Sequence, residues 1–205
     1  RAQSEREPRA LLRRDPRLYI ERLENNRRLK LVFRPAVLLL YKLEGYMSLN
    51  DEGKCRELIA KLDGMKLQPR DRLQFYQTKL SFYAYAGDGE QAKATLTQLE
   101  DFLHKSGADE VDQYKKLLRQ ARQIVAVYVD KDISMLPKLQ RQAAATKDGA
   151  DRGLLQFRIA KLSHYAGNED QAEVYLNRAA KNLKNTAYSV IIDSALEDHS
   201  VLERY

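Results

Sequence analysis

The chain has one cysteine, no tryptophan, five prolines and nine glycines among its 205 residues. A single cysteine excludes an internal disulfide and a cysteine-based metal site. The small number of prolines and glycines excludes a collagen-like or low-complexity chain. The given sequence also lacks an apolar run of the about 18 residues that a membrane-spanning helix needs. Its most apolar stretch, Phe33 to Tyr41, is short, and Arg34 and Pro35 interrupt it.

Patterns typical of catalytic and metal sites are missing as well. His104, His164 and His199 are far apart in the sequence and show no metal-ligand spacing. There is no phosphate-binding glycine loop, no GxSxG sequence and no CxxC pair. Cys55 falls on an inner position of a predicted helix, where a buried structural thiol is expected. The sequence therefore predicts no catalytic residue, no metal, no cofactor and no small-molecule substrate, and we expect the protein not to be an enzyme.

The net charge of +7 is concentrated at the start of the chain. Residues 1–34 hold 11 Lys or Arg and 5 Asp or Glu, which leaves residues 35–205 with a net charge of +1. A nucleic-acid groove would carry positive charge across the folded body, so nucleic acid is not the favoured partner. We therefore divide the chain into a basic N-terminal stem and helix at 1–34 and a helical domain at 35–205.

The N-terminal arginines allow two interpretations. The sequence begins at Arg1 rather than Met and continues with Arg9, Arg13, Arg14 and Arg17. Such a cluster commonly flanks a membrane helix on its cytoplasmic side, which would place an anchor before Arg1. It is equally typical of a solvated basic helix, and the sequence does not separate the two. In both interpretations a cytoplasmic location is expected.

The apolar residues recur at i, i+3 and i+4 along the chain, which predicts helices throughout. No stretch shows the alternation of a half-buried strand. The expected helical pairs meet at turns near Asn50, Gly87, Asp130 and Gly167, after a helix at 16–33 and before a capping helix at 186–203. Within the third pair, Pro137 is expected to begin or to kink a helix.

One phrase occurs twice, 80 residues apart. The sequence YAGDGEQA at 85–92 returns as YAGNEDQA at 165–172, and a leucine follows four residues later in both copies. Gly87 and Gly167 allow a left-handed residue at the end of a helix. Ala92 and Ala172 allow the next helix to approach its partner closely.

This phrase resembles the tetratricopeptide repeat, in which two helices meet at a glycine and an alanine begins the second helix. The resemblance is strong in the second and fourth pairs and looser in the first and third, where Asn50 and Asp130 stand in place of glycine. It implies an all-α fold, a tetratricopeptide-like right-handed α-solenoid of about four pairs with an extra helix at each end. The layout also resembles bacterial membrane-anchored proteins with a cytoplasmic domain of this type.

The resemblance further implies a non-enzymatic scaffold for protein–protein interaction. Tetratricopeptide repeats usually bind a peptide or a partner helix on the concave face formed by the first helix of each pair. By motif position, that face would carry Gln74, Gln77, Ser81, Gln120, Phe157, Lys161 and His164. For each residue the alternative is an ordinary solvated helix face.

Two other functions stay open. The chain could be a self-associating structural or assembly module tethered to the membrane, or a nucleic-acid binder that uses its arginine-rich stem. The identity of the partner and the oligomeric state are not indicated by the sequence.

Overall fold

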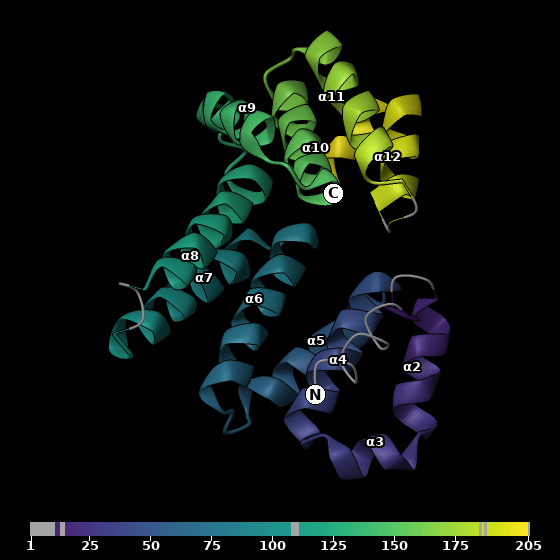
Figure 1. Cartoon of the computed structure of the whole chain (residues 1–205), viewed down its shortest axis with the longest axis vertical. Helices are drawn as coiled ribbons and strands as arrows, with labels where there is room; N and C mark the ends of the chain where they lie inside the picture. The colour runs from purple at the N-terminus through teal and green to yellow at the C-terminus, as the bar shows by residue number, and fades with distance from the viewer. Residues whose placement is uncertain (1–10, 13–14, 108–110, 185, 187, 205) are drawn as a thin grey trace. The chain divides into compact units, whose positions relative to one another are not determined.

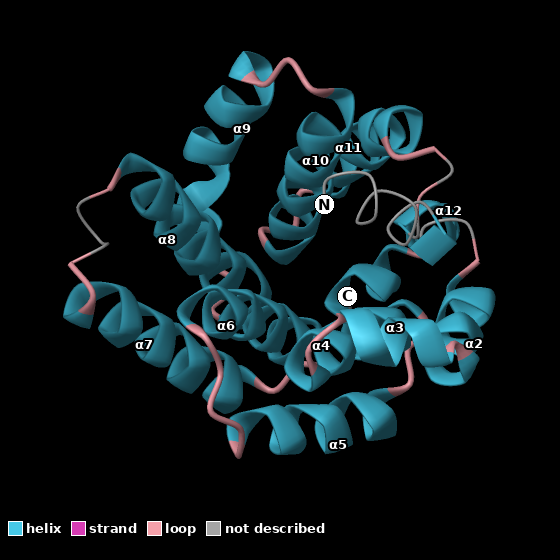
Figure 2. Ribbon diagram, turned by 60° about the horizontal axis from the view of Figure 1, so that its bottom comes forward, coloured by secondary structure: helices cyan, strands magenta, loops and turns pink. Residues whose placement is uncertain are grey.

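The computed structural model describes residues 11–12, 15–107, 111–184, 186 and 188–204. Within these residues the regular structure is helical, and Figure 2 shows no strand in the described part of the chain. None of the described helices is both long and apolar enough to cross a bilayer. The chain divides into two compact units, one formed by the described residues of Arg1–Phe82 and Ala94–Ala108, the other by those of Tyr83–Lys93 and Asp109–Tyr205.

The first unit contains the N-terminal helices and most of the second helical pair. Its helices, labelled in Figure 1, are α2 (Pro16–Asn25), α3 (Arg27–Val32), α4 (Pro35–Ser48), α5 (Glu52–Asp63), and the larger parts of α6 (Pro69–Tyr85) and α7 (Gly89–Lys105). α2 packs against α4, and α4 pairs with α5. The single helix expected at 16–33 is interrupted at Asn26, whose side chain accepts a hydrogen bond from the Arg28 amide and starts a new helix.

Three contacts hold α6 in the first unit. The Gln74 amide donates to the Glu44 carboxylate on α4 at 3.0 Å. Buried Lys79 pairs with Asp63 at the end of α5, at 2.8 Å. The rings of Tyr76 and Phe102 meet edge to face, with centroids 5.9 Å apart, so α6 also packs on α7.

The second unit contains the remaining helices. They are α8 (Asp112–Ile124), the π-turn η1 (Val125–Val129), the short 3-10 helix η2 (Ile133–Met135), α9 (Leu136–Ala145), α10 (Gly149–Tyr165), α11 (Glu169–Asn182), α12 (Tyr188–Glu197) and the 3-10 helix η3 (His199–Glu203). α10 packs against both α9 and α11, and α12 packs against α11 and η3. Pro137 lies in the first turn of α9, as expected for a helix that begins there.

The turns carry the left-handed residues that the sequence predicts, with one displacement. Gly87 and Gly167 have φ of 77° and 72°, and Asn50 has φ of 54°. In the third pair the left-handed residue is Lys131, with φ of 51°, rather than Asp130. The reason is the π-turn, in which the Asp130 amide donates to the Val125 carbonyl and one extra residue is taken up before the turn.

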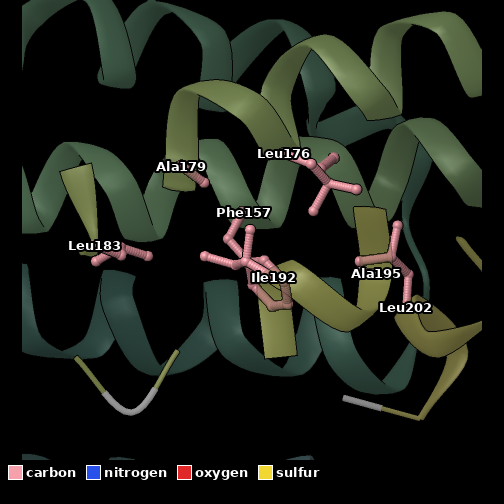
Figure 3. Packing of buried hydrophobic residues seen from close by; sticks show 8 residues of the cluster. Phe157, Leu176, Ala179, Leu183, Ile192, Ala195 and Leu202 are labelled. Carbon is pink, nitrogen blue, oxygen red and sulfur yellow. The ribbon is translucent and has the colours of Figure 1, made fainter. Parts of the chain in front are cut away.

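The core of the second unit is formed by α10, α11, α12 and η3, and Figure 3 shows their side chains meeting. Its buried members are Phe157, Ala160, Leu176, Ala179, Leu183, Ile192, Ala195 and Leu202. The single terminal helix expected at 186–203 is interrupted. Asp198 caps η3 by accepting from the Ser200 amide at 2.9 Å, so the chain changes direction between α12 and η3.

Gly153 is expected to be required for the packing of α10 on α11. A β-carbon at this position would lie 2.7 Å from Leu183 Cγ and 2.9 Å from Asn182 Cβ. Overpacking of this kind outweighs the gain in helix propensity, so Gly153→Ala should lower the free energy of unfolding by about 1 kcal/mol. Urea denaturation followed by circular dichroism measures this change.

Gly53→Ala in α5 is the matched control, because the nearest atom to its new β-carbon is 3.8 Å away. This variant should be as stable as the wild type or slightly more stable. A Gly153→Ala protein at least as stable as the wild type would show that the two helices can move apart without loss.

Candidate functional site

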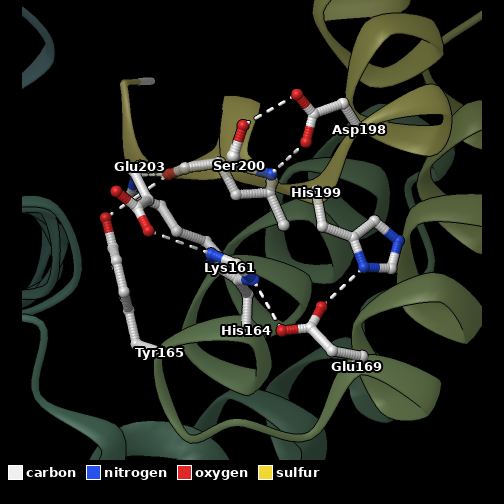
Figure 4. A network of polar contacts seen from close by, with 9 residues as sticks. Lys161, His164, Tyr165, Glu169, Asp198, His199, Ser200 and Glu203 are labelled. Carbon is white, nitrogen blue, oxygen red and sulfur yellow. Dashed lines mark hydrogen bonds and ion pairs between the residues drawn. The ribbon is translucent and has the colours of Figure 1, made fainter.

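Three of the predicted site residues lie together on one face of α10. Phe157, Lys161 and His164 are spaced by four and three residues, which places them one above the other on a helix. The segment η3 packs against α10, and its residues contact this face (Figure 4). The candidate site is therefore the α10 face together with the chain's own segment His199–Glu203, which we call the C-terminal segment.

Leu202 anchors the C-terminal segment to α10. Its side chain is fully buried in the same cluster as Phe157. Its carbonyl oxygen accepts hydrogen bonds from Lys161 Nζ and, at 3.4 Å, from the Tyr165 hydroxyl. The segment is thus held by an apolar side chain and by its main chain at the same residue.

Lys161 is buried, with 2% of its surface exposed. Its Nζ lies 5.5 Å from the centre of the Tyr128 ring and 5.0 Å from that of Tyr165. Burial first, and then the positive charge of Lys131, lower the pKa of Lys161 to about 8, against the opposing effect of the Glu203 carboxylate. Two ring faces and one carbonyl therefore replace the water that a lysine normally has around its ammonium group.

The Glu169 carboxylate connects His164 on α10 with His199 in the C-terminal segment. It lies 2.6 Å from His199 Nδ1 and 2.9 Å from His164 Nδ1, so it stands between the two histidines (Figure 4). The hydrogen bond to His199, followed by that to His164, holds the pKa of Glu169 below its ordinary value. His164 Nε2 also lies 3.5 Å from Glu203, so polar contacts flank Leu202 on the face of α10.

A second polar cluster holds α10 against α8 and α9. Arg158 donates to Gln123 at 2.8 Å, and Gln123 donates to Gln142 at 2.8 Å. The rings of Tyr128 and Tyr85 meet edge to face at 4.8 Å. Burial raises the pKa of Tyr128, which keeps its hydroxyl neutral beside the Arg158 guanidinium. This cluster fixes the helix that carries the site.

The remaining predicted site residues are placed elsewhere. Gln74, Gln77 and Ser81 lie on α6 in the first unit, where Gln77 is exposed and the other two are half-buried. Gln120 is exposed on α8.

On α10, the structure differs from the expectation of an open face. Phe157 and Lys161 are buried and His164 is half-buried, because α12 and the C-terminal segment cover this face. What was expected to contact a partner contacts the chain itself.

Several residues of the site were not predicted. They are Glu169, His199, Leu202, Glu203 and the ring of Tyr128. The contact between Lys161 and Leu202 joins residues 41 positions apart, and helical periodicity carries no information on such a pairing. The acidic start of α11 was visible in the repeated phrase, but nothing in the sequence linked it to two histidines.

The polar side chains of the site contact one another and the chain's own C-terminal segment. Cys55 is buried in the first unit, and burial raises the pKa of its thiol to about 12. Among the described residues, no group of three or more His, Cys, Asp or Glu is arranged to hold a metal ion. The polar groups around Leu202 are engaged in hydrogen bonds and ion pairs with one another.

No family model, no curated protein and no solved structure matches the chain.

Replacing Lys161 by Met should change how stability depends on pH. Below about pH 8 the lysine is protonated in the folded and the unfolded chain, and the cost of burying its charge is complete. Above its ordinary pKa of 10.5 it is neutral in both states and this cost is absent. The free energy of unfolding of the wild type should therefore rise with pH relative to that of Lys161→Met, by about 3 kcal/mol over the whole range.

Urea denaturation of both proteins between about pH 7 and pH 9.5 covers much of this change. Groups that titrate in both proteins, such as Cys55, cancel in the difference. Two stability curves that run parallel would contradict a lowered pKa at Lys161.

Proposed function

We propose that the protein is a non-enzymatic protein–protein interaction module built of tetratricopeptide-like hairpins, and that it binds a short peptide on the face of α10. Within each unit, successive first helices of the expected pairs touch through side chains: Gln74 of α6 with Glu44 of α4, and Arg158 of α10 with Gln123 of α8. Stacking of first helices is what a repeat of this kind requires. The left-handed residues at the four turns support the same proposal.

The observation that carries the proposal is the C-terminal segment itself. A five-residue stretch of chain lies on the face where the sequence placed a peptide. It inserts one apolar side chain, presents one carbonyl to Lys161 and Tyr165, and adds polar contacts on either side. An apolar anchor with convergent hydrogen bonds is how short peptides are generally recognised.

The contacts define the chemistry of the partner. The buried position takes a leucine-sized side chain, because Leu202 is fully enclosed. The following residue should be acidic, since Glu203 lies beside His164. A polar or charged residue three positions before the anchor would meet Glu169, as His199 does. The proposed ligand is a single helical turn of a partner protein, which replaces the C-terminal segment on α10.

A binding experiment tests this proposal. A chain ending at Glu197 is titrated with a fluorescent peptide of residues 197–204, and the fluorescence anisotropy is recorded. The peptide should bind with a Kd of about 1–100 µM, the range expected for a short peptide with one buried anchor. The same peptide with Leu202→Asp should not bind, and Lys161→Met in the chain should weaken binding by about fivefold or more.

Two controls keep the result interpretable. Circular dichroism establishes whether the shortened chain is folded, and the intact double variant His199→Ala, Glu203→Ala loosens the segment without removing its anchor. That variant should bind the peptide more tightly than the wild type does. A folded short chain that ignores the peptide, or binds the Leu202→Asp peptide equally well, would contradict the proposal.

A further inference from the structure

The short helix α3 in the first unit has two different faces. Leu29 packs against the cluster of Tyr19, Ile20 and Leu23, and Phe33 meets Tyr41 edge to face with ring centroids 5.7 Å apart. Leu29 and Phe33 are four residues apart, so one side of α3 and of its C-terminal cap faces the protein. The helix is therefore fixed in rotation by these two contacts.

The opposite side of α3 presents apolar side chains to solvent. Leu31 is 87% exposed and Val32 is 74% exposed, and they are the two most exposed large apolar residues of the described chain. Arg27 lies one turn before Leu31, and Arg28 lies one turn before Val32. Both arginines are exposed as well. The outer face of α3, formed by these four residues, is thus apolar and cationic at once.

The nearest acidic residue in the sequence is Glu24, three residues before Arg27. Residues 25–43 contain five basic residues and no Asp or Glu. In the described structure, Arg34 pairs with Asp71 and Lys42 pairs with Glu24. These two ion pairs thus use basic residues beside the outer face, and Arg27 and Arg28 themselves are exposed.

We propose that the outer face of α3 docks on an anionic membrane surface, where Leu31 and Val32 enter the boundary between headgroups and acyl chains and Arg27 and Arg28 bind lipid phosphates. A bilayer of this kind offers hydrocarbon and negative charge within one layer, which matches the composition of the face. A nucleic acid would match the arginines alone and leave two apolar side chains without a use. This surface lies on α3 and does not depend on peptide binding at α10.

The test uses the full chain and sedimentation with vesicles. One set contains equal parts of phosphatidylcholine and phosphatidylglycerol, and the other contains phosphatidylcholine alone. The chain should sediment with the anionic vesicles, and binding should fall as salt is added. The double variant Leu31→Gln, Val32→Gln should bind the anionic vesicles at least about tenfold more weakly than the wild type does. The double variant Arg27→Gln, Arg28→Gln should lose about fivefold or more and show a weaker salt effect.

Matched variants control for changes unrelated to α3. Val190→Gln removes a single apolar side chain that is 71% exposed on α12, and Lys138→Gln with Arg141→Gln removes two exposed charges from α9. Both should bind anionic vesicles within about twofold of the wild type. Circular dichroism checks that each variant is folded.

Three results would overturn the proposal. The first is equal binding of the wild type and the Leu31, Val32 variant to anionic vesicles. The second is a wild type that sediments as a dimer without lipid while the Leu31, Val32 variant sediments as a monomer, because the face would then join two copies of the chain. The third is binding to a polynucleotide that depends on Arg27 and Arg28, together with no binding to anionic vesicles.

Discussion

The second unit depends on the close approach of α10 and α11. Ala160, Ala172 and Ala179 are fully enclosed, and Gly153 leaves no space for a β-carbon against the end of α11. Small residues at such a contact let two helix axes come near each other, and the larger side chains then point to the flanks. One flank of α10 carries Phe157, and it is this side that α12 and the C-terminal segment cover. The contact between α10 and α11 therefore leaves the side of α10 with Phe157 available to form the candidate site.

Much of the fold was predictable from local signals. The glycine turns at 87 and 167, the start of a helix around Pro137 and the helical class all follow from short-range chemistry, and the structure confirms them. The breaks at Asn26 and Asp198 were missed although both residues are good helix caps. Apolar spacing continues across each break, and a pattern averaged over several turns does not register one altered residue. The π-turn was not predicted for the same reason, because one extra residue does not show in a pattern averaged over several turns.

The candidate site was predictable only in part. Helical spacing correctly places Phe157, Lys161 and His164 on one face, because that depends on the helix alone. Whether the face is open depends on a segment some forty residues later, and no local pattern specifies that contact. Motif position placed Lys161 on an open face, and lysine is in general seldom buried. Its burial is tolerable here because a carbonyl and two aromatic rings surround the ammonium group, and these partners come from three separate elements.

The repeated phrase shows how one turn can serve two purposes. In its first copy, the residue that opens the second helix is Gly89, and Val129 lies 2.8 Å from where a β-carbon would be. In the second copy the same position is Glu169, which reaches two histidines. Exchanging these two residues would place a carboxylate where there is no room and leave both imidazoles without their shared acceptor. The two copies thus form the same turn between helices, but their sequences are not interchangeable. An engineered duplication of the phrase must therefore match this position to its surroundings, with glycine beside Val129 and glutamate beside the two histidines.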